Sequence, residues 1–180
     1  MITEATGALT TVEETARHTL ADCEAWRELT ATVGNERSSL ARIHTDALPP
    51  PPDEAEAYNR EQVEGLRPYA LLWLAADGGF RRHIVAKDTR NRFSDSGEVR
   101  VKICATVPSE LAGDPAEADR QFKNSIGTII NQLCDLAGQA GYLDFTELEL
   151  TAGPWRNGDE EALAEGDVIG CDMSLLWDRQ

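Results

Sequence analysis

The stretch FKNSIGTIINQLCDLAGQAGYLDFTELEL, residues 122–150, predicts a long helix that leads directly into a strand. Its apolar side chains recur every three or four residues, which places them on one face of a helix. Gly138 and Gly141 are typical of a helix end. The residues of the apolar face are Phe122, Ile126, Ile129, Ile130, Leu133 and Ala137. We therefore expect a helix over residues 116–140 with one buried side and no obvious catalytic group.

The strand after this helix has an irregular pattern. Its sequence is YLDFTELELT, and its apolar residues are Leu143, Phe145, Leu148 and Leu150. Between the second and the third of these, the apolar positions shift by one residue. Such a shift moves the side chains to the other face of a strand. We therefore expect a bulge or a kink near Thr146.

Capping patterns mark the starts of two helices. Asp114 is a typical N-cap residue, and Pro115 suits the first position of the long helix. Nearer the N-terminus, Thr11 and Glu14 have the spacing of a capping box, and apolar residues follow at helical intervals. This pattern predicts a second helix over residues 12–32.

Three further segments predict strands. RPYALLWLAAD, residues 67–77, is apolar on both faces and favours a buried central strand. GEVRVKICATVP, residues 97–108, and GDVIGCDMSLLWD, residues 166–178, alternate between apolar and polar residues. In residues 97–108, we expect one face to meet water or a partner through Arg100, Lys102, Cys104 and Thr106. The order of elements predicts an α+β fold, a mostly antiparallel sheet with an N-terminal helix and a second long helix packed on it.

The domain organisation follows from length and composition. The chain has 180 residues, of which 41% are hydrophobic, so we expect a single α+β domain over residues 1–180. Four consecutive prolines and the acidic residues after them predict a proline-rich and acidic connector over residues 49–65. Residues 81–97 follow a glycine pair and predict a protruding loop or hairpin.

Charge and cysteine content restrict the class of protein. The net charge of −15 disfavours nucleic acid, so no specific nucleic-acid binding is expected. No signal-peptide pattern and no apolar run near ~18 residues is present, so we expect synthesis in the cytoplasm and no membrane partner. The cysteines are far apart in sequence and lie on or near apolar faces, which predicts buried free thiols at Cys23, Cys104, Cys134 and Cys171.

No motif in the chain identifies a chemical activity. The three histidines lack metal-binding spacing, and the phosphate-binding and nucleophile motifs G-x-x-x-x-G-K-[ST], G-x-G-x-x-G and G-x-S-x-G are absent. We therefore expect no catalytic residue, no metal, no cofactor and no enzymatic activity. A small enzyme without a recognised motif is the alternative.

One segment has a charge opposite to that of the whole chain. Residues 81–92 hold five basic residues and one acidic residue. This segment is either a solvated hairpin or a docking surface for an acidic partner, and the second reading makes it a candidate interaction site. Trp155 in the loop GPWRNG is either packed against the sheet edge or an interface anchor. The candidate interaction residues are Arg81, Arg82, Lys87, Arg90, Arg92, Phe93 and Trp155.

The order of these segments resembles that of the tail-terminator and tail-completion proteins of tailed phages and prophages. The segments are DCEAWREL, ARIHTDALPPP, LRPYALLWL, GEVRVKICATVP, FKNSIGTIINQLCDLA, GYLDFTELEL followed by GP, and GDVIGCDMSLLWD. Together they span about residues 12–178. The resemblance implies a small α+β subunit that forms a ring, with six copies expected, at the head-proximal end of the tail.

Such a ring stops tube polymerisation and meets the neck. Its implied partners are further copies of itself, the tail-tube protein and a neck or head-completion protein. The implied location is the virion tail, after synthesis in the cytoplasm of a bacterial host. A head–tail neck adaptor and a soluble α+β ligand-binding or regulatory domain outside the virion are the alternatives.

Overall fold

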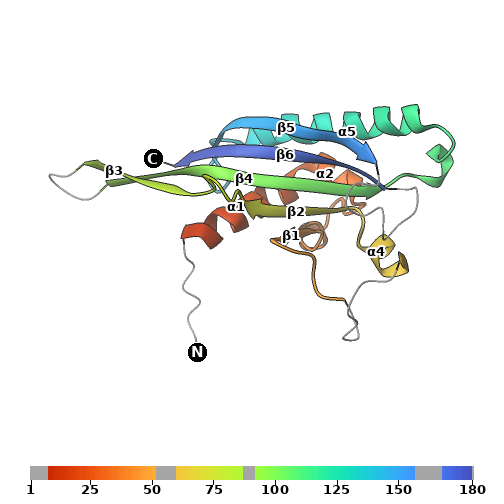
Figure 1. The fold of residues 1–180 in the computed structure, drawn as a ribbon, viewed down its shortest axis with the longest axis horizontal. Coiled ribbons are helices and arrows are strands. Elements are labelled where there is room, and N and C mark those ends of the chain that lie inside the picture. Colours follow the sequence, from red (N-terminus) through yellow and green to blue (C-terminus); the bar gives the residue numbers. More distant parts are fainter. Residues whose placement is uncertain (1–7, 52–59, 87–91, 157–167, 180) are drawn as a thin grey trace.

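The computed structural model describes residues 8–51, 60–86, 92–156 and 168–179, and these form an α+β fold as predicted (Figure 1). In chain order the elements are α1 (Ala8–Asp22), α2 (Glu24–Leu29), α3 (Glu36–Leu40), β1 (Ile43–Thr45), α4 (Arg60–Leu66), β2 (Tyr69–Leu74), β3 (Arg81–Ala86), β4 (Arg92–Thr106), the 3-10 helix η2 (Ser109–Leu111), α5 (Pro115–Leu136), β5 (Phe145–Arg156) and β6 (Val168–Arg179).

The strands form one mixed sheet in the order β1-β2-β4-β6-β5, and β3 pairs with β4 outside this path. Only the β1–β2 pair is parallel among the described strands; the other four pairs are antiparallel. The strand expected within residues 67–77 is β2, which lies between β1 and β4. The mostly antiparallel sheet is therefore confirmed.

One face of the sheet is covered by α1, α2 and α5, which lie behind it in Figure 1. Strict alternation brings every second residue of β4 and β6 to this face, where Val99, Ile103 and Met173 are among the buried residues. The helices supply matching apolar residues, including Trp26 and Ile129, neither of which is exposed at all. The core thus lies between these helices and one side of the sheet.

The long helix begins and ends close to its predicted bounds. The side chain of Asp114 accepts a hydrogen bond from the backbone N–H of Glu117 at 3.1 Å, and Pro115 occupies the first turn. The helix stops at Leu136, four residues earlier than expected. Gly138 then adopts a φ of +75°, a conformation that favours glycine.

The prediction of one N-terminal helix over residues 12–32 is wrong. The helix α1 begins by Ala8, so Thr11 lies inside it and is not its cap. Cys23 adopts an extended conformation and separates α1 from α2. The break is compensated by tertiary hydrogen bonds, since the side chain of Gln132 accepts from the N–H of Ala25 at 2.9 Å.

The uncovered face of the sheet differs from its prediction at one position. Arg100 and Thr106 of β4 are exposed and Lys102 is half-buried, but Cys104 is fully buried. Its direct neighbour across the strands is Tyr69 of β2, which is also buried. Therefore this face is closed around Cys104 and meets solvent at Arg100 and at Thr106.

The other sequence predictions about strands and cysteines have mixed outcomes. The bulge expected near Thr146 is present, because the register of β5 with β6 shifts between Phe145 and Glu147.

All four cysteines are free thiols, as predicted. However, Cys134 is exposed, since it lies one residue beyond the buried Leu133 of α5 and points away from the sheet.

Residues 81–97 include a β-hairpin that extends beyond the helix-covered part of the sheet (Figure 1). We call β3 and its partner segment of β4, residues 92–96, the arm. The tip, residues 87–91, lies outside the described residues. Within the connector, residues 49–51 form neither helix nor strand, and α4 begins at Arg60.

Candidate interaction surfaces

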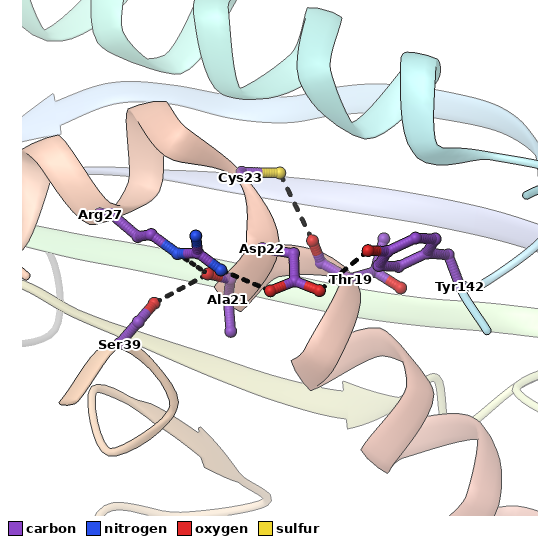
Figure 2. A network of polar contacts seen from close by, with 7 residues as sticks. All are labelled: Thr19, Ala21, Asp22, Cys23, Arg27, Ser39 and Tyr142. Carbon is purple, nitrogen blue, oxygen red and sulfur yellow. Dashed lines mark hydrogen bonds and ion pairs between the residues drawn. The ribbon is translucent and has the colours of Figure 1, made fainter. Parts of the chain in front are cut away.

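A polar network fixes the break between α1 and α2 and ties it to distant parts of the chain (Figure 2). The carbonyl oxygen of Ala21 accepts from Arg27 Nε at 2.7 Å and from Ser39 Oγ at 3.0 Å. The carboxylate of Asp22 pairs with Arg27 and accepts a hydrogen bond from the hydroxyl of Tyr142 at 3.0 Å. This last bond raises the pKa of Tyr142.

The same network positions the start of β5. The hydroxyl of Thr19 accepts a hydrogen bond from the backbone N–H of Leu143 at 2.9 Å, and that hydroxyl itself donates to Thr15. Leu143 and Tyr142 precede β5 by two and three residues. The break in the N-terminal helix therefore serves to hold the α5–β5 connection, and through it the outer strand of the sheet, in a defined place.

The arm is less positively charged than its sequence suggests. Arg82 makes a two-point ion pair with Asp95 across the hairpin, with Nε–Oδ1 and Nη2–Oδ2 distances of 2.7 and 2.8 Å. Its guanidinium also lies over the ring of Phe80, 5.6 Å from the centroid. The hydrogen bond to Asp95 raises the pKa of Arg82. The charge of Arg82 is therefore compensated within the arm itself.

The structure describes the side chains of only some of the other predicted interaction residues. Arg81 is exposed on β3, next to Arg82. Arg92 and Phe93 begin β4 and Trp155 lies near the end of β5, but the side chains of these three are outside the described residues. Lys87 and Arg90 also lie outside them. The arm and Trp155 are at opposite ends of the sheet, since Trp155 pairs with Gly170 beside Cys104, whereas Arg81 pairs with Ser96. They do not form one site.

Sequence reasoning missed the surface formed by β5. Among the described strands β5 pairs only with β6, so its outer edge is free. Glu147 and Glu149 are exposed, and Leu150 retains 43% of its surface in contact with solvent. The alternation of Glu and Leu in TELEL was a signal of a half-solvated strand, but the sequence did not show which strand forms the edge.

A small polar cluster lies on the uncovered face beside this edge. Glu98 accepts hydrogen bonds from Ser174 Oγ at 2.8 Å and from Arg100 Nε at 3.0 Å. Burial raises the pKa of Glu98, but these two hydrogen bonds outweigh it and leave the pKa below its ordinary value. The cluster is an ionised, internally paired group, and its carboxylate is not suited to accept a proton from a substrate near neutral pH.

A cavity of about 340 Å³ lies between α1 and the α5–β5 connection. It is lined by residues 138–144 with Thr15, Trp177 and Asp178 among others. The indole nitrogen of Trp177 is buried and has no hydrogen-bond partner. Within the described ranges, no group of three potential metal ligands occurs.

The buried thiols are unsuited to nucleophilic chemistry. Burial raises the pKa of Cys23 and of Cys171 to about 12. A thiol with such a pKa is protonated at neutral pH, and the thiolate is the reactive form. These cysteines therefore act as small apolar side chains of the core.

The sequence matches no protein-family model and no curated protein. No helix in the described part of the chain has the length and apolar character needed to cross a membrane.

Proposed function

We propose that this chain is a tail terminator, a virion structural protein of a tailed phage that forms a ring, caps the tail tube and joins it to the neck. The observation that carries the proposal is the contrast between one helix-covered face and two exposed sheet edges, β5 and the arm. A subunit of a ring needs a rigid scaffold and edges that match its neighbours, and it needs no reacting group.

The proposal assigns each part of the molecule a role. Helix α5 supports the sheet from the core side, with Phe122, Ile126, Ile129 and Leu133 buried beneath it. The edges and the arm contact other copies, the tail-tube protein or a neck protein. The chain would be made in the bacterial cytoplasm and reside in the virion tail, without a cofactor and without catalytic activity.

The test is deletion of the gene in its native genetic context, followed by electron microscopy of the tails. If the chain terminates tails, the tubes should exceed their normal length, because nothing stops polymerisation. Supplying the wild-type gene in trans is the control and should restore the normal length. Tails of normal length without the chain, or purified virions that lack it, would contradict the proposal. Tail-tube genes beside this gene would favour it.

Two alternatives lead to different results. A head–tail neck adaptor would leave tail length unchanged on deletion and would prevent joining of heads to tails. The cavity between α1 and the α5–β5 connection favours a ligand-binding domain instead. In that case deletion would alter neither the tail length nor the joining of heads to tails.

A further inference from the structure

We propose that copies of this chain join edge to edge, with strand β5 of one copy pairing in antiparallel fashion with strand β3 of the next. This inference rests on the proposed function for the identity of the assembly, and it names the contact that would build the ring. It starts from the position of the two strands. β5 forms one edge of the sheet, and β3 lies on the opposite side of β4.

Each of the two edges has a regular stretch of four residues. In β3 the register with β4 is continuous from Arg81 to Ile84 and shifts after it. In β5 the register with β6 is continuous from Glu147 to Leu150, between two shifts. Because bulges interrupt a strand edge, these are the segments in which each edge offers an unbroken row of backbone groups to a further strand.

The two stretches carry Arg81 and Glu149, which are opposite in charge and lie on the same face of the sheet. Arg81 is paired with Ser96, and Glu149 with Ser174, which places both on the uncovered face that also holds Arg100. The same parity places His83 and Glu147 on this face. All four of these basic and acidic side chains are exposed.

The directions of the strands also agree with a continued sheet. β4 is antiparallel to β3 and to β6, and β5 is antiparallel to β6, so β5 and β3 run in opposite directions. A second copy in the same orientation therefore presents its β3 antiparallel to β5, with uncovered face beside uncovered face. In this register Arg81 lies opposite Glu149, His83 opposite Glu147, and Arg82 opposite Leu148.

Opposite edges that join head to tail form a heterologous contact, which closes into a ring when the rotation between copies allows it. Charged residues on edges also act as a protection against uncontrolled pairing. That role alone requires no match between the two edges. The shared face, the opposite charge and the antiparallel direction are what favour a specific contact with a second copy.

Two charge-reversed variants of the full chain test the contact. The β3 variant carries Arg81→Glu and His83→Glu, and the β5 variant carries Glu147→Lys and Glu149→Lys. Each alone should self-associate on the order of tenfold more weakly than wild type in sedimentation velocity, because like charges face each other at every contact. A control with Glu24→Lys and Lys123→Glu, two exposed helix residues, should associate like wild type. Circular dichroism checks that all variants fold.

The decisive step is to mix the two variants in equal amounts. Every β5–β3 contact between unlike copies again joins opposite charges, so association should return to the wild-type level as alternating assemblies with an even number of subunits. The chain with all four substitutions should also associate by itself. Three results would each overturn the contact. The wild-type chain could stay monomeric at every concentration, the variants could associate as wild type does, or the mixture could fail to recover association.

The result is separate from that of the proposed function because sedimentation is read without tail tubes. If the charge pairing holds in solution but deletion leaves tail length unchanged, the contact stands and the terminator assignment fails. If both single-edge variants restore normal tail length in the deletion strain, the assignment stands and the contact fails.

Discussion

The helix-covered face and the exposed strands β5 and β3 have opposite designs. On the covered face, apolar residues from α1, α2, α5 and the sheet are buried together, and the polar groups at the helix break are joined in one network. On β5 and β3 charged side chains face solvent, and among the described strands no further strand pairs with their outer edges. The difference indicates that stability resides in the covered region, and we propose that recognition resides in the exposed strands. Substitutions should therefore separate the two properties.

The largest effect is expected in the middle of α5. Ile129 is fully buried against the core, so Ile129→Ala should lower the free energy of unfolding by about 2–5 kcal/mol. Denaturant unfolding measures the change, with Asn131→Ala on the exposed side of the same helix as the control. A loss below about 0.5 kcal/mol would show that the core does not depend on this face of α5. It would contradict the assignment of stability to the helix-covered region.

A smaller loss is expected in the network that holds the helix break. Asp22→Ala would remove the ion-pair partner of Arg27, which keeps only the carbonyl oxygen of Ala21, and the acceptor of the Tyr142 hydroxyl. The loss should cost about 1–3 kcal/mol of unfolding free energy. The exposed Asp135→Ala is the matched control. Tyr142→Phe tests the coupling: once Asp22 has been replaced, removal of this hydroxyl should cause little further loss. Fully additive losses would show that the two residues act independently.

A pH effect is expected from His44 of β1. Burial, followed by the charges of Arg17 and Arg42, lowers the pKa of His44 in the folded chain. As pH falls below the ordinary histidine pKa of about 6.5, the unfolded chain therefore binds this proton more readily than the folded one, and stability decreases. Replacing His44 with Gln should make the dependence of unfolding free energy on pH shallower between about pH 7.5 and 5.5. An unchanged dependence would remove His44 as a cause.

The smallest effect on folding is expected at the edges. Glu147→Gln and Arg81→Gln alter exposed side chains, so each should change the unfolding free energy by less than about 0.5 kcal/mol. Thermal melting and denaturant unfolding provide the measurement. If either substitution destabilises the monomer as strongly as Asp22→Ala does, the edges belong to the stabilising region and the proposed division is incorrect.

The parts of the fold that depend on local pattern were predictable from sequence. The cap at Asp114, the alternation of β4 and β6 and the bulge near Thr146 each follow from a few neighbouring residues. The break at Cys23 was not predictable, because the acceptor that compensates it, Gln132, is 107 residues away from Ala25. Local signals continued through this point at helical spacing.

The candidate site was predicted only in part. The basic residues of the arm could be found from their charge, but their number overstated the free charge, since pairing of Arg82 with Asp95 depends on hairpin register. The β5 edge was missed because Glu147 and Glu149 become an edge only through the order of strands, which no local pattern contains. Interaction surfaces of this kind are properties of the assembled sheet.

The most direct test of the central claim, that the chain is a ring-forming subunit, is the mass of its assembled state. Native mass spectrometry of the full chain, alone across a wide concentration range and with tail tubes of the same phage, gives the number of copies. We expect one discrete closed assembly, with six copies as the predicted number. Its population should rise with concentration, and it should bind the tubes. A monomer under all conditions, including with tubes, would contradict the claim.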